Sequence, residues 1–110
     1  METITYDDFA KLNIRIGTIR SVELIEGADK LLKLMVDVGE ETPRQILSGI
    51  RMFFTDPQEL VGKQCPFLIN LAPRTIRGLE SNGMILAAGD AETFSLLHPT
   101  KILPHGTEVH

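Results

Sequence analysis

Hydrophobic and polar positions alternate over several short segments of the chain, and this pattern predicts β-strands. Segment 14–25 is rich in Ile, Val and Thr, residues that favour the pleated surface of a sheet. Gly17 lies early in this segment, and the apolar positions do not alternate strictly along it. A long strand that bends at a glycine bulge would account for both features.

A second strand is predicted over segment 31–38, because Leu32, Leu34 and Val36 share one face of an extended chain. Lys33 lies on the opposite, less apolar face. The same apolar positions would also suit a short helix, so the helical alternative stays open at this point. Three more strands are predicted from apolar runs over 45–50, 64–71 and 84–88.

Two short helices are predicted from their capping residues. In segment 5–12, Thr5 is followed three residues later by Asp8, a weaker relative of the capping box. In segment 55–63, Asp56 can cap the first turn and a proline occupies the first helical position. The second helix should span only one or two turns.

Three strands, a short helix and two more strands is the order of the oligonucleotide-binding (OB) fold, a five-stranded Greek-key barrel. SH3-like and other small barrels share much of this order. We predict an all-β single domain over 1–110, in which ligands meet strands two and three and the loops 26–30 and 72–83. Beyond the fifth strand, short apolar pieces alternate with turn residues, which predicts an appended hairpin or ribbon.

Composition and charge narrow the range of functions. A content of 43% hydrophobic and 24% charged residues is typical of globular domains, and 110 residues support one core. No apolar run is long enough to cross a bilayer, and the amino terminus is acidic where a secretory signal would be basic, so we expect a cytoplasmic protein without membrane association. The net charge of −4 argues against coating nucleic acid through bulk electrostatics, so any RNA site must be local.

The residues that most often carry covalent chemistry do not form a recognisable site. The three histidines, His98, His105 and His110, lack the paired spacing of a zinc site and are read as solvated or turn residues. Cys65 stands among apolar residues, which favours a buried thiol over a reactive one. No phosphate-binding glycine pattern or nucleophile elbow is present. We therefore expect no catalytic residues, no metal and no cofactor.

The segment 70–88 holds the side chains best suited to bind RNA. Arg74 and Arg77 lie three residues apart, and guanidinium groups can form forked hydrogen bonds to phosphate oxygens. Polar side chains able to contact ribose and base edges flank them at Asn70, Ser81 and Asn82. An ordinary flexible surface loop explains the composition equally well. The few aromatic residues do not accompany the basic ones, so recognition of a folded RNA through backbone and shape fits better than serial base stacking.

At these residues the sequence resembles the tRNA-binding domain family. The family includes the carboxyl-terminal domain or separate beta subunit of methionyl-tRNA synthetase, free-standing structure-specific tRNA-binding proteins and a secretion chaperone-like branch. The matching segments are 8–19, 26–34, 47–50, 57–63 and 70–88, so the resemblance covers nearly the whole chain.

The resemblance implies an OB barrel whose carboxyl-terminal extension serves homodimerisation, and non-catalytic binding to the outside corner of tRNA. The positions that match the family's RNA-facing residues are Lys33, Asn70, Arg74, Ser81 and Met84. Lys30 and Arg77 are added by proximity and charge. Met84 opens an apolar strand and would also be explained by packing.

Three functional alternatives remain from the sequence. The chain resembles a free-standing tRNA-binding protein or a separate subunit, and an excised domain is equally compatible; a methionyl-tRNA synthetase catalytic subunit is a candidate partner. The runner-up is a chaperone-like protein that binds unfolded peptides, although that branch lacks the S-N-G-M-I-L-A-A type of ending seen at 81–88. A third alternative is a purely structural dimerisation module of a synthetase.

Overall fold

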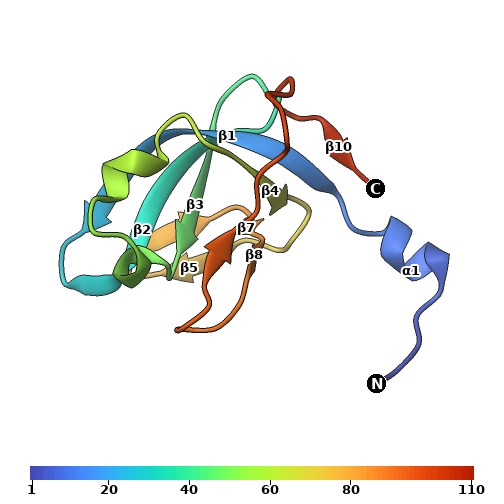
Figure 1. The fold of residues 1–110 in the computed structure, drawn as a ribbon, viewed down its shortest axis with the longest axis horizontal. Coiled ribbons are helices and arrows are strands. Elements are labelled where there is room, and N and C mark those ends of the chain that lie inside the picture. Colours follow the sequence, from blue (N-terminus) through green and yellow to red (C-terminus); the bar gives the residue numbers. More distant parts are fainter.

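Helix α1 (Tyr6–Ala10) begins at a capping box, as the sequence predicts. In the computed structural model, which describes residues 1–110, the Asp8 N–H donates to Thr5 Oγ1 over 3.2 Å and the Thr5 N–H donates to Asp8 Oδ2 over 3.1 Å. No residue of α1 is buried, and the helix stands apart from the sheet (Figure 1). The contacts that hold α1 in place therefore involve its ends rather than an apolar face.

The next three strands form an antiparallel meander. They are β1 (Ile14–Ile25), β2 (Ala28–Asp37) and β3 (Arg44–Ser48). Side chains of β2 alternate between buried and partly exposed, which excludes the helical alternative for this segment. The turn before β2 is shorter than predicted, because Ala28 already pairs with Ile25.

Strand β1 is bulged, but the predicted bulge at Gly17 is wrong. The register with β2 shifts after Ile19 and again after Leu24. Gly17 instead permits a close approach: a Cβ at this position would lie 2.6 Å from Val36 Cγ1 and 2.8 Å from Phe67 Cδ2. The glycine is thus required by packing inside the barrel and not by a break in the ladder.

Two 3-10 turns connect β3 to the next strand. The first, η1 (Arg51–Phe53), was not predicted from the sequence. The second, η2 (Pro57–Leu60), lies where a short helix is predicted, and Asp56 Oδ1 accepts a hydrogen bond from the Gln58 N–H over 3.1 Å. Leu60 is fully buried and attaches η2 to the core.

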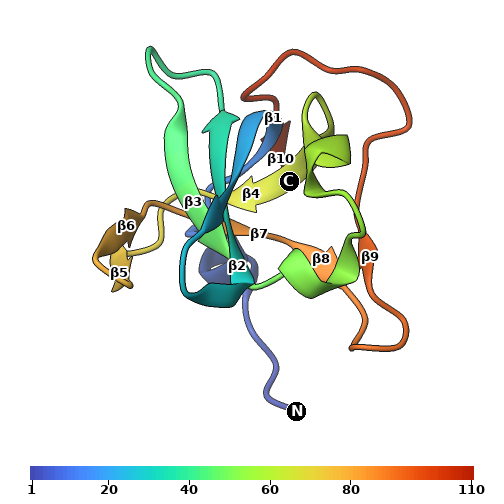
Figure 2. The same cartoon turned by 90° about the vertical axis from the view of Figure 1, so that its left-hand side faces the viewer.

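The remaining barrel strands pair through β1. Strand β4 (Gln64–Leu68) pairs with β1, and β7 (Met84–Ile85) pairs with β4, giving the order β3-β2-β1-β4-β7. The barrel closes where the Asn82 N–H donates to the Gln45 carbonyl over 2.9 Å. This arrangement confirms the predicted OB-type barrel (Figure 2). The single fifth strand predicted over 84–88 is split into β7 and β8 (Ala87–Ala88).

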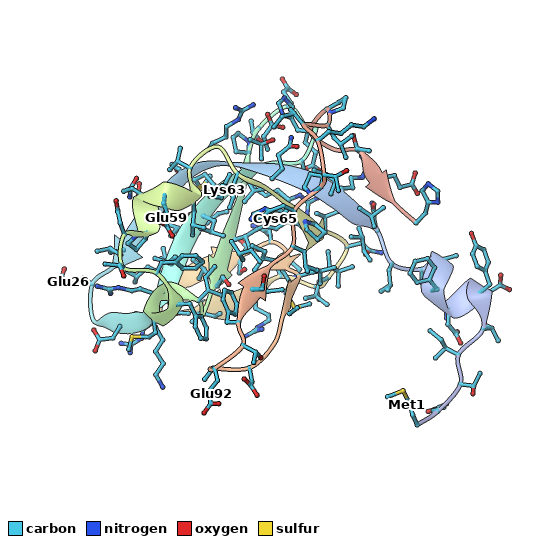
Figure 3. The ribbon with its side chains drawn as sticks, viewed as in Figure 1. Met1, Glu26, Glu59, Lys63, Cys65 and Glu92 are labelled. Atoms are coloured by element: carbon cyan, nitrogen blue, oxygen red, sulfur yellow. The ribbon has the colours of Figure 1, made fainter.

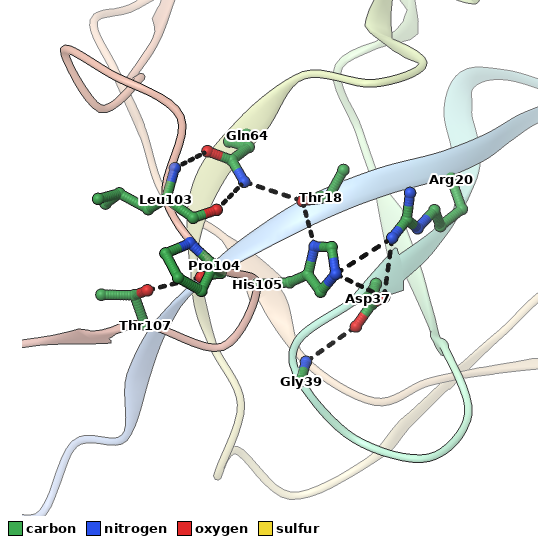
Figure 4. Close-up of polar contacts among 9 residues, drawn as sticks. All are labelled: Thr18, Arg20, Asp37, Gly39, Gln64, Leu103, Pro104, His105 and Thr107. Carbon is green, nitrogen blue, oxygen red and sulfur yellow. Dashed lines mark hydrogen bonds and ion pairs between the residues drawn. The ribbon is translucent and has the colours of Figure 1, made fainter.

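The carboxyl-terminal segment does not form the predicted hairpin or ribbon of its own. Strand β9 (Ser95–Leu96) pairs with β8, whereas β10 (Glu108–Val109) pairs with the beginning of β1. Gln64 ties the segment between them to the barrel. Its side chain accepts from the Leu103 N–H over 3.0 Å and donates to the Leu103 carbonyl over 2.7 Å and to Thr18 Oγ1 over 3.0 Å (Figure 4).

The core fills the interior of the barrel. Its fully buried side chains of largest volume are Phe67, Ile19, Leu32, Leu34, Ile46, Leu60, Val36, Val38 and Cys65. The predicted burial of Cys65 is confirmed, and this burial raises the pKa of its thiol to about 11 (Figure 3). No helix of the structure has the length and apolar character needed to span a bilayer.

Candidate functional site

The segment expected to be a flexible loop is a β-hairpin. Strands β5 (Arg74–Ile76) and β6 (Leu79–Ser81) pair in register, with Ile76 opposite Leu79. The two turn residues, Arg77 and Gly78, both have positive φ, 54° and 78°. This is the backbone of the tight turn whose twist matches that of paired strands. The hairpin therefore presents Arg74 and Arg77 from an ordered frame (Figure 2).

Hydrogen bonds fasten this hairpin to β3. The Leu47 N–H donates to Ser81 Oγ over 3.0 Å, and Gln45 Nε2 donates to the Glu80 carbonyl over 2.9 Å. Arg44 Nη1 reaches across the base of the hairpin to the Asn82 carbonyl over 3.0 Å. Because the Leu47 bond is buried and the Arg44 bond is partly buried, the hairpin is an extension of the barrel wall rather than a mobile appendage.

Arg44 is itself held by a forked ion pair. Its Nε and Nη2 atoms donate to the two carboxylate oxygens of Glu40 over 2.7 and 2.8 Å. Hydrogen bonding to Arg44 lowers the pKa of Glu40, and the same bond raises the pKa of Arg44. Arg44 therefore has a structural role at the base of the hairpin, since its guanidinium forms hydrogen bonds within the protein.

The tip of the hairpin lies beside the turn between β1 and β2. A Cβ placed on Gly27 would be 3.8 Å from Arg77 Nη1, so the guanidinium lies directly over this glycine. The two loops that the OB prediction assigns to ligand contact are thus brought together. Glu26, labelled in Figure 3, precedes Gly27 at this end of the barrel.

One row of paired residues connects Lys33 with Arg74 across four elements. Lys33 pairs with Leu47 of β3, the Leu47 N–H donates to Ser81 Oγ, and Ser81 pairs with Arg74. On the other side of the row, Lys33 pairs with Glu23 of β1, and Lys33 Nζ lies 2.7 Å from Glu23 Oε2. The predicted cations on β2 and in the hairpin therefore lie along one row of neighbouring strands.

Two further cations border this surface. Lys30 is exposed on β2 and forms no ion pair. Arg51, in η1, donates to the Ala28 carbonyl over 3.3 Å, which places it beside the start of β2. Arg51 is not among the predicted site residues, because nothing in the local sequence indicates that η1 packs next to this strand.

The uncharged residues of the predicted site, Asn70, Ser81 and Met84, differ in their contacts and exposure. The Asn70 amide is engaged by the amino-terminal segment: its oxygen accepts from the Asn13 N–H over 2.8 Å and its nitrogen donates to the Lys11 carbonyl over 2.6 Å. Ser81 is buried, and its hydroxyl also donates to the Gly83 carbonyl over 3.2 Å. Met84 is 41% exposed at the start of β7.

Ion pairing separates the basic residues into two groups. Four of the 11 Lys and Arg residues form ion pairs: Lys11, Arg20, Lys33 and Arg44. Arg74, Arg77 and Lys30 are not among them, so their charge at this end of the barrel is available to an outside anion. No group of three or more His, Cys, Asp or Glu side chains is placed to hold a metal ion.

Comparison with known sequences gives a consistent result. Residues 14–108 match the family described as "Putative tRNA binding domain". The chain is 52% identical over 110 residues to "Methionine--tRNA ligase" of Methanococcoides burtonii, covering 99% of this chain and 16% of that protein. It is 54% identical over 106 residues to the protein of the same name from Methanoregula boonei, covering 96% of this chain and 15% of that protein. The chain thus spans about one sixth of the length of these relatives.

Solved structures show the same fold over nearly all of this chain. A "MetRS related protein" from Pyrococcus horikoshii superposes with a TM-score of 0.91 at 35% identity, covering 100% of both chains. The chaperone CsaA from Bacillus anthracis superposes with a TM-score of 0.87 at 28% identity, covering 99% of this chain and 100% of that one. The C-terminal domain of Plasmodium vivax p43 gives a TM-score of 0.85 at 36% identity, covering 93% and 61%.

Proposed function

Because the chain belongs to the tRNA-binding domain family, we propose that it binds folded tRNA without catalysing a reaction. The binding surface is formed by the β5–β6 hairpin, the turn between β1 and β2, and the outer face of β2 and β3. The observation that carries this assignment is the position of Arg77 over Gly27, which joins the two loops into one surface with unpaired cations. Local charge of this kind can act in an acidic protein because salt screens the more distant carboxylates.

The residues divide into contacting and positioning groups. Arg74, Arg77, Lys30 and Lys33 contact phosphates, and Arg51 adds a cation at the border. The exposed Met84 contacts the RNA through its apolar side chain. Two of the predicted residues position the surface and do not contact the RNA. Ser81 holds the hairpin on β3, and Asn70 holds the amino-terminal segment.

Recognition should depend on the shape of the RNA more than on its sequence. Phosphate contacts carry little sequence information, and the grooves of A-form RNA hide the base edges. Different elongator tRNAs should therefore bind within a few-fold of one another, and a linear RNA of equal length should bind much more weakly. A preference of about 100-fold for one tRNA would require direct base readout in place of this account.

The hairpin assignment is tested by comparing two arginine variants. Arg74→Ala should weaken all tRNAs alike and reduce the slope of log affinity against log salt by somewhat under about one for each engaged subunit. Arg20→Ala is the control, because Arg20 is held by Asp37 on another part of the barrel, with Nη2 and Oδ2 3.0 Å apart. Equal losses of affinity in two folded variants would reject the hairpin as the binding surface.

The same protein should form a homodimer. Helix α1 buries none of its residues, and apolar side chains of the amino-terminal segment are exposed: Ile4 by 61%, Tyr6 by 76% and Leu12 by 46%. Ile102 of the carboxyl-terminal segment is 84% exposed. An isologous partner would remove this apolar area from water.

Light scattering should therefore give a mass near twice 12.2 kDa. Tyr6→Asp should shift the equilibrium towards monomer. Met52→Asp, which changes an equally exposed apolar residue in η1, should leave the mass unchanged. A monomeric mass for the unaltered protein at micromolar concentration would contradict the proposal.

The identities to two proteins named methionine–tRNA ligase support a role next to that enzyme. We propose that the chain is the tRNA-binding part of a methionine–tRNA ligase, either as a domain of the enzyme or as a separate subunit. Added to a methionine–tRNA ligase that lacks this domain, it should lower the tRNA concentration needed for half-maximal rate. Chain variants that lose tRNA binding should lose this effect.

A chaperone-like activity is the second candidate. It is favoured by a hollow of about 290 Å³ whose lining includes Phe53, Phe54 and Phe94, and by the superposition on CsaA. Binding of an unfolded polypeptide should be compared with binding of bulk tRNA by the same preparation. Polypeptide binding that is abolished by Phe53→Ser, without any tRNA binding, would replace the first proposal by this one.

A further inference from the structure

A second hollow lies between the beginning of β4 and the carboxyl-terminal segment. Its volume is about 410 Å³, and it is lined by residues 62–64 and 98–102. This size falls in the range of sites for small molecules. Ile102 is the one hydrophobic residue of the lining, so an apolar ligand would bury little of its surface against apolar side chains. The hollow is suited to a polar or charged group.

A single residue fixes both ends of the loop that forms one wall. The Gln64 carbonyl lies 2.7 Å from His98 Nδ1. The Gln64 side chain makes two hydrogen bonds to the backbone of Leu103, which Figure 4 shows. Residues 98–103 are thereby held as an arch against the barrel. A wall that is held at both ends loses little conformational freedom when a ligand binds.

The charges that face this hollow are all basic. Lys63 stands on one side, labelled in Figure 3, and Lys101 stands in the arch. Neither lysine forms an ion pair, and no carboxylate is among the lining residues. Glu59 borders the neighbouring hollow together with Lys63 and His98 and does not pair with Lys63. The first hollow thus brings together two unpaired lysines in a chain of net charge −4.

The bond to Gln64 also orients His98. Since a carbonyl only accepts, Nδ1 carries the proton and Nε2 is the free ring nitrogen. His98 lines the hollow with the two lysines, and its Nε2 makes no hydrogen bond within the protein. The arrangement supplies several donors for an oxyanion.

We propose that Lys63, His98 and Lys101 form a phosphate-binding site within this hollow. Lysine binds phosphate as a point charge and does not require forked geometry, which suits two ammonium groups on separate walls. The site lies on the side of β4 and η2, whereas the β5–β6 hairpin projects from the opposite side of the barrel (Figure 2). It therefore does not rest on the tRNA-binding surface. The phosphate comes either from a small phosphorylated molecule or from the backbone of RNA.

The existence of the site is tested with the full chain, using pyrophosphate and ATP as ligands and adenosine as the uncharged control. Titration calorimetry and amide shifts in residues 62–64 and 98–102 report binding. The double variant Lys63→Ala with Lys101→Ala should weaken binding of both phosphate ligands at least about tenfold. Lys11→Ala changes an exposed lysine of the amino-terminal segment and should have no effect. Thermal unfolding of each variant checks that the fold is retained.

Every outcome decides the proposal. It is overturned if pyrophosphate does not bind, if adenosine binds as well as ATP, if the double variant binds pyrophosphate and ATP as tightly as the unaltered chain, or if Lys11→Ala weakens binding as much as the double variant. If only the double variant binds pyrophosphate and ATP more weakly, its affinity for tRNA then identifies the source of the phosphate. An unchanged affinity for tRNA assigns the site to small phosphorylated molecules, and a parallel loss of tRNA affinity assigns it to the RNA backbone.

Discussion

Ser81 Oγ accepts a hydrogen bond from the backbone N–H of Leu47 over 3.0 Å, and this bond joins the hairpin to β3. Both residues are buried, and the same hydroxyl donates to the Gly83 carbonyl. Ser81→Ala should lower the free energy of unfolding by about 1–3 kcal/mol, because the Leu47 N–H would remain buried without a partner. Urea denaturation measures this loss.

Ser95→Ala is the matched control for that substitution. Ser95 is exposed, and its hydroxyl bonds only the neighbouring Leu96 carbonyl over 2.9 Å. Its change in unfolding free energy should stay within about 0.5 kcal/mol. Equal small changes in both variants would show that Ser81 does not hold the hairpin on the barrel.

Gly17 should not tolerate a side chain. A Cβ at this position would lie 2.6 Å from Val36 and 2.8 Å from Phe67, two fully buried core residues. Gly17→Ala should therefore destabilise the protein by about 1–3 kcal/mol through overpacking. Gly49→Ala is the comparison, since its nearest neighbour beyond the local chain is the Lys30 carbonyl at 3.9 Å. Similar thermal unfolding of both variants would contradict a packing role for Gly17.

The meander could be predicted from the sequence because its signals are local. Alternating burial along β2 follows directly from residues 32, 34 and 36, and the cap of η2 is contained in the tetrapeptide that starts at Asp56. The position of the bulges in β1 could not be predicted, since it depends on the register with β2. Gly17 was a misleading signal, because a glycine required by close packing resembles a glycine required by a bulge.

Long-range pairing explains the other differences. The sequence predicts a loop over 72–83, yet within it Arg77 and Gly78 form a tight turn between two short paired strands. A dipeptide with an arginine at positive φ carries no strong turn signal. Likewise β10 pairs with β1 from the other end of the chain, and Arg51 reaches the binding surface only through the packing of η1. The local sequence around these residues does not indicate any of these contacts.

Glu40 should stabilise the fold at neutral pH and not in acid. Its pair with Arg44 lowers the folded pKa below the usual value of 4.5. The stabilisation is thus present above about pH 4.5 and is lost as the pH falls through the folded pKa. Glu40→Gln should cost less than about 1 kcal/mol at neutral pH, because the carboxylate is partly exposed. Denaturation of both proteins across the acid range measures the difference.

Glu41→Gln serves as the control for this pH dependence. Glu41 is exposed beside Glu40 and forms no ion pair. Its substitution removes the same charge without removing the bonds to Arg44. If the stability difference between Glu40→Gln and the unaltered protein stayed constant into strong acid, the ion pair with Arg44 would not be its source.

We expect Glu23 to compete with the proposed RNA ligand for Lys33. The two side chains are directly opposite on β1 and β2, and Lys33 Nζ lies 2.7 Å from Glu23 Oε2. A phosphate that approaches Lys33 must displace this carboxylate, which is 58% exposed, and is repelled by it. Glu23→Gln should therefore raise tRNA affinity and steepen its dependence on salt by up to about one unit of slope.

Removal of any carboxylate from an acidic protein reduces general repulsion, so a distant substitution is needed for comparison. Glu108→Gln changes the same charge in β10, which lies at the far end of β1 from Glu23 (Figure 1). We expect little change in affinity from it, because screening extends over only about 8 Å at physiological salt. If Glu108→Gln and Glu23→Gln raised affinity equally, net charge would explain the gain and Lys33 would not be a phosphate contact. A gain confined to Glu23→Gln, and abolished when Lys33→Ala is added, would place the RNA backbone on β2.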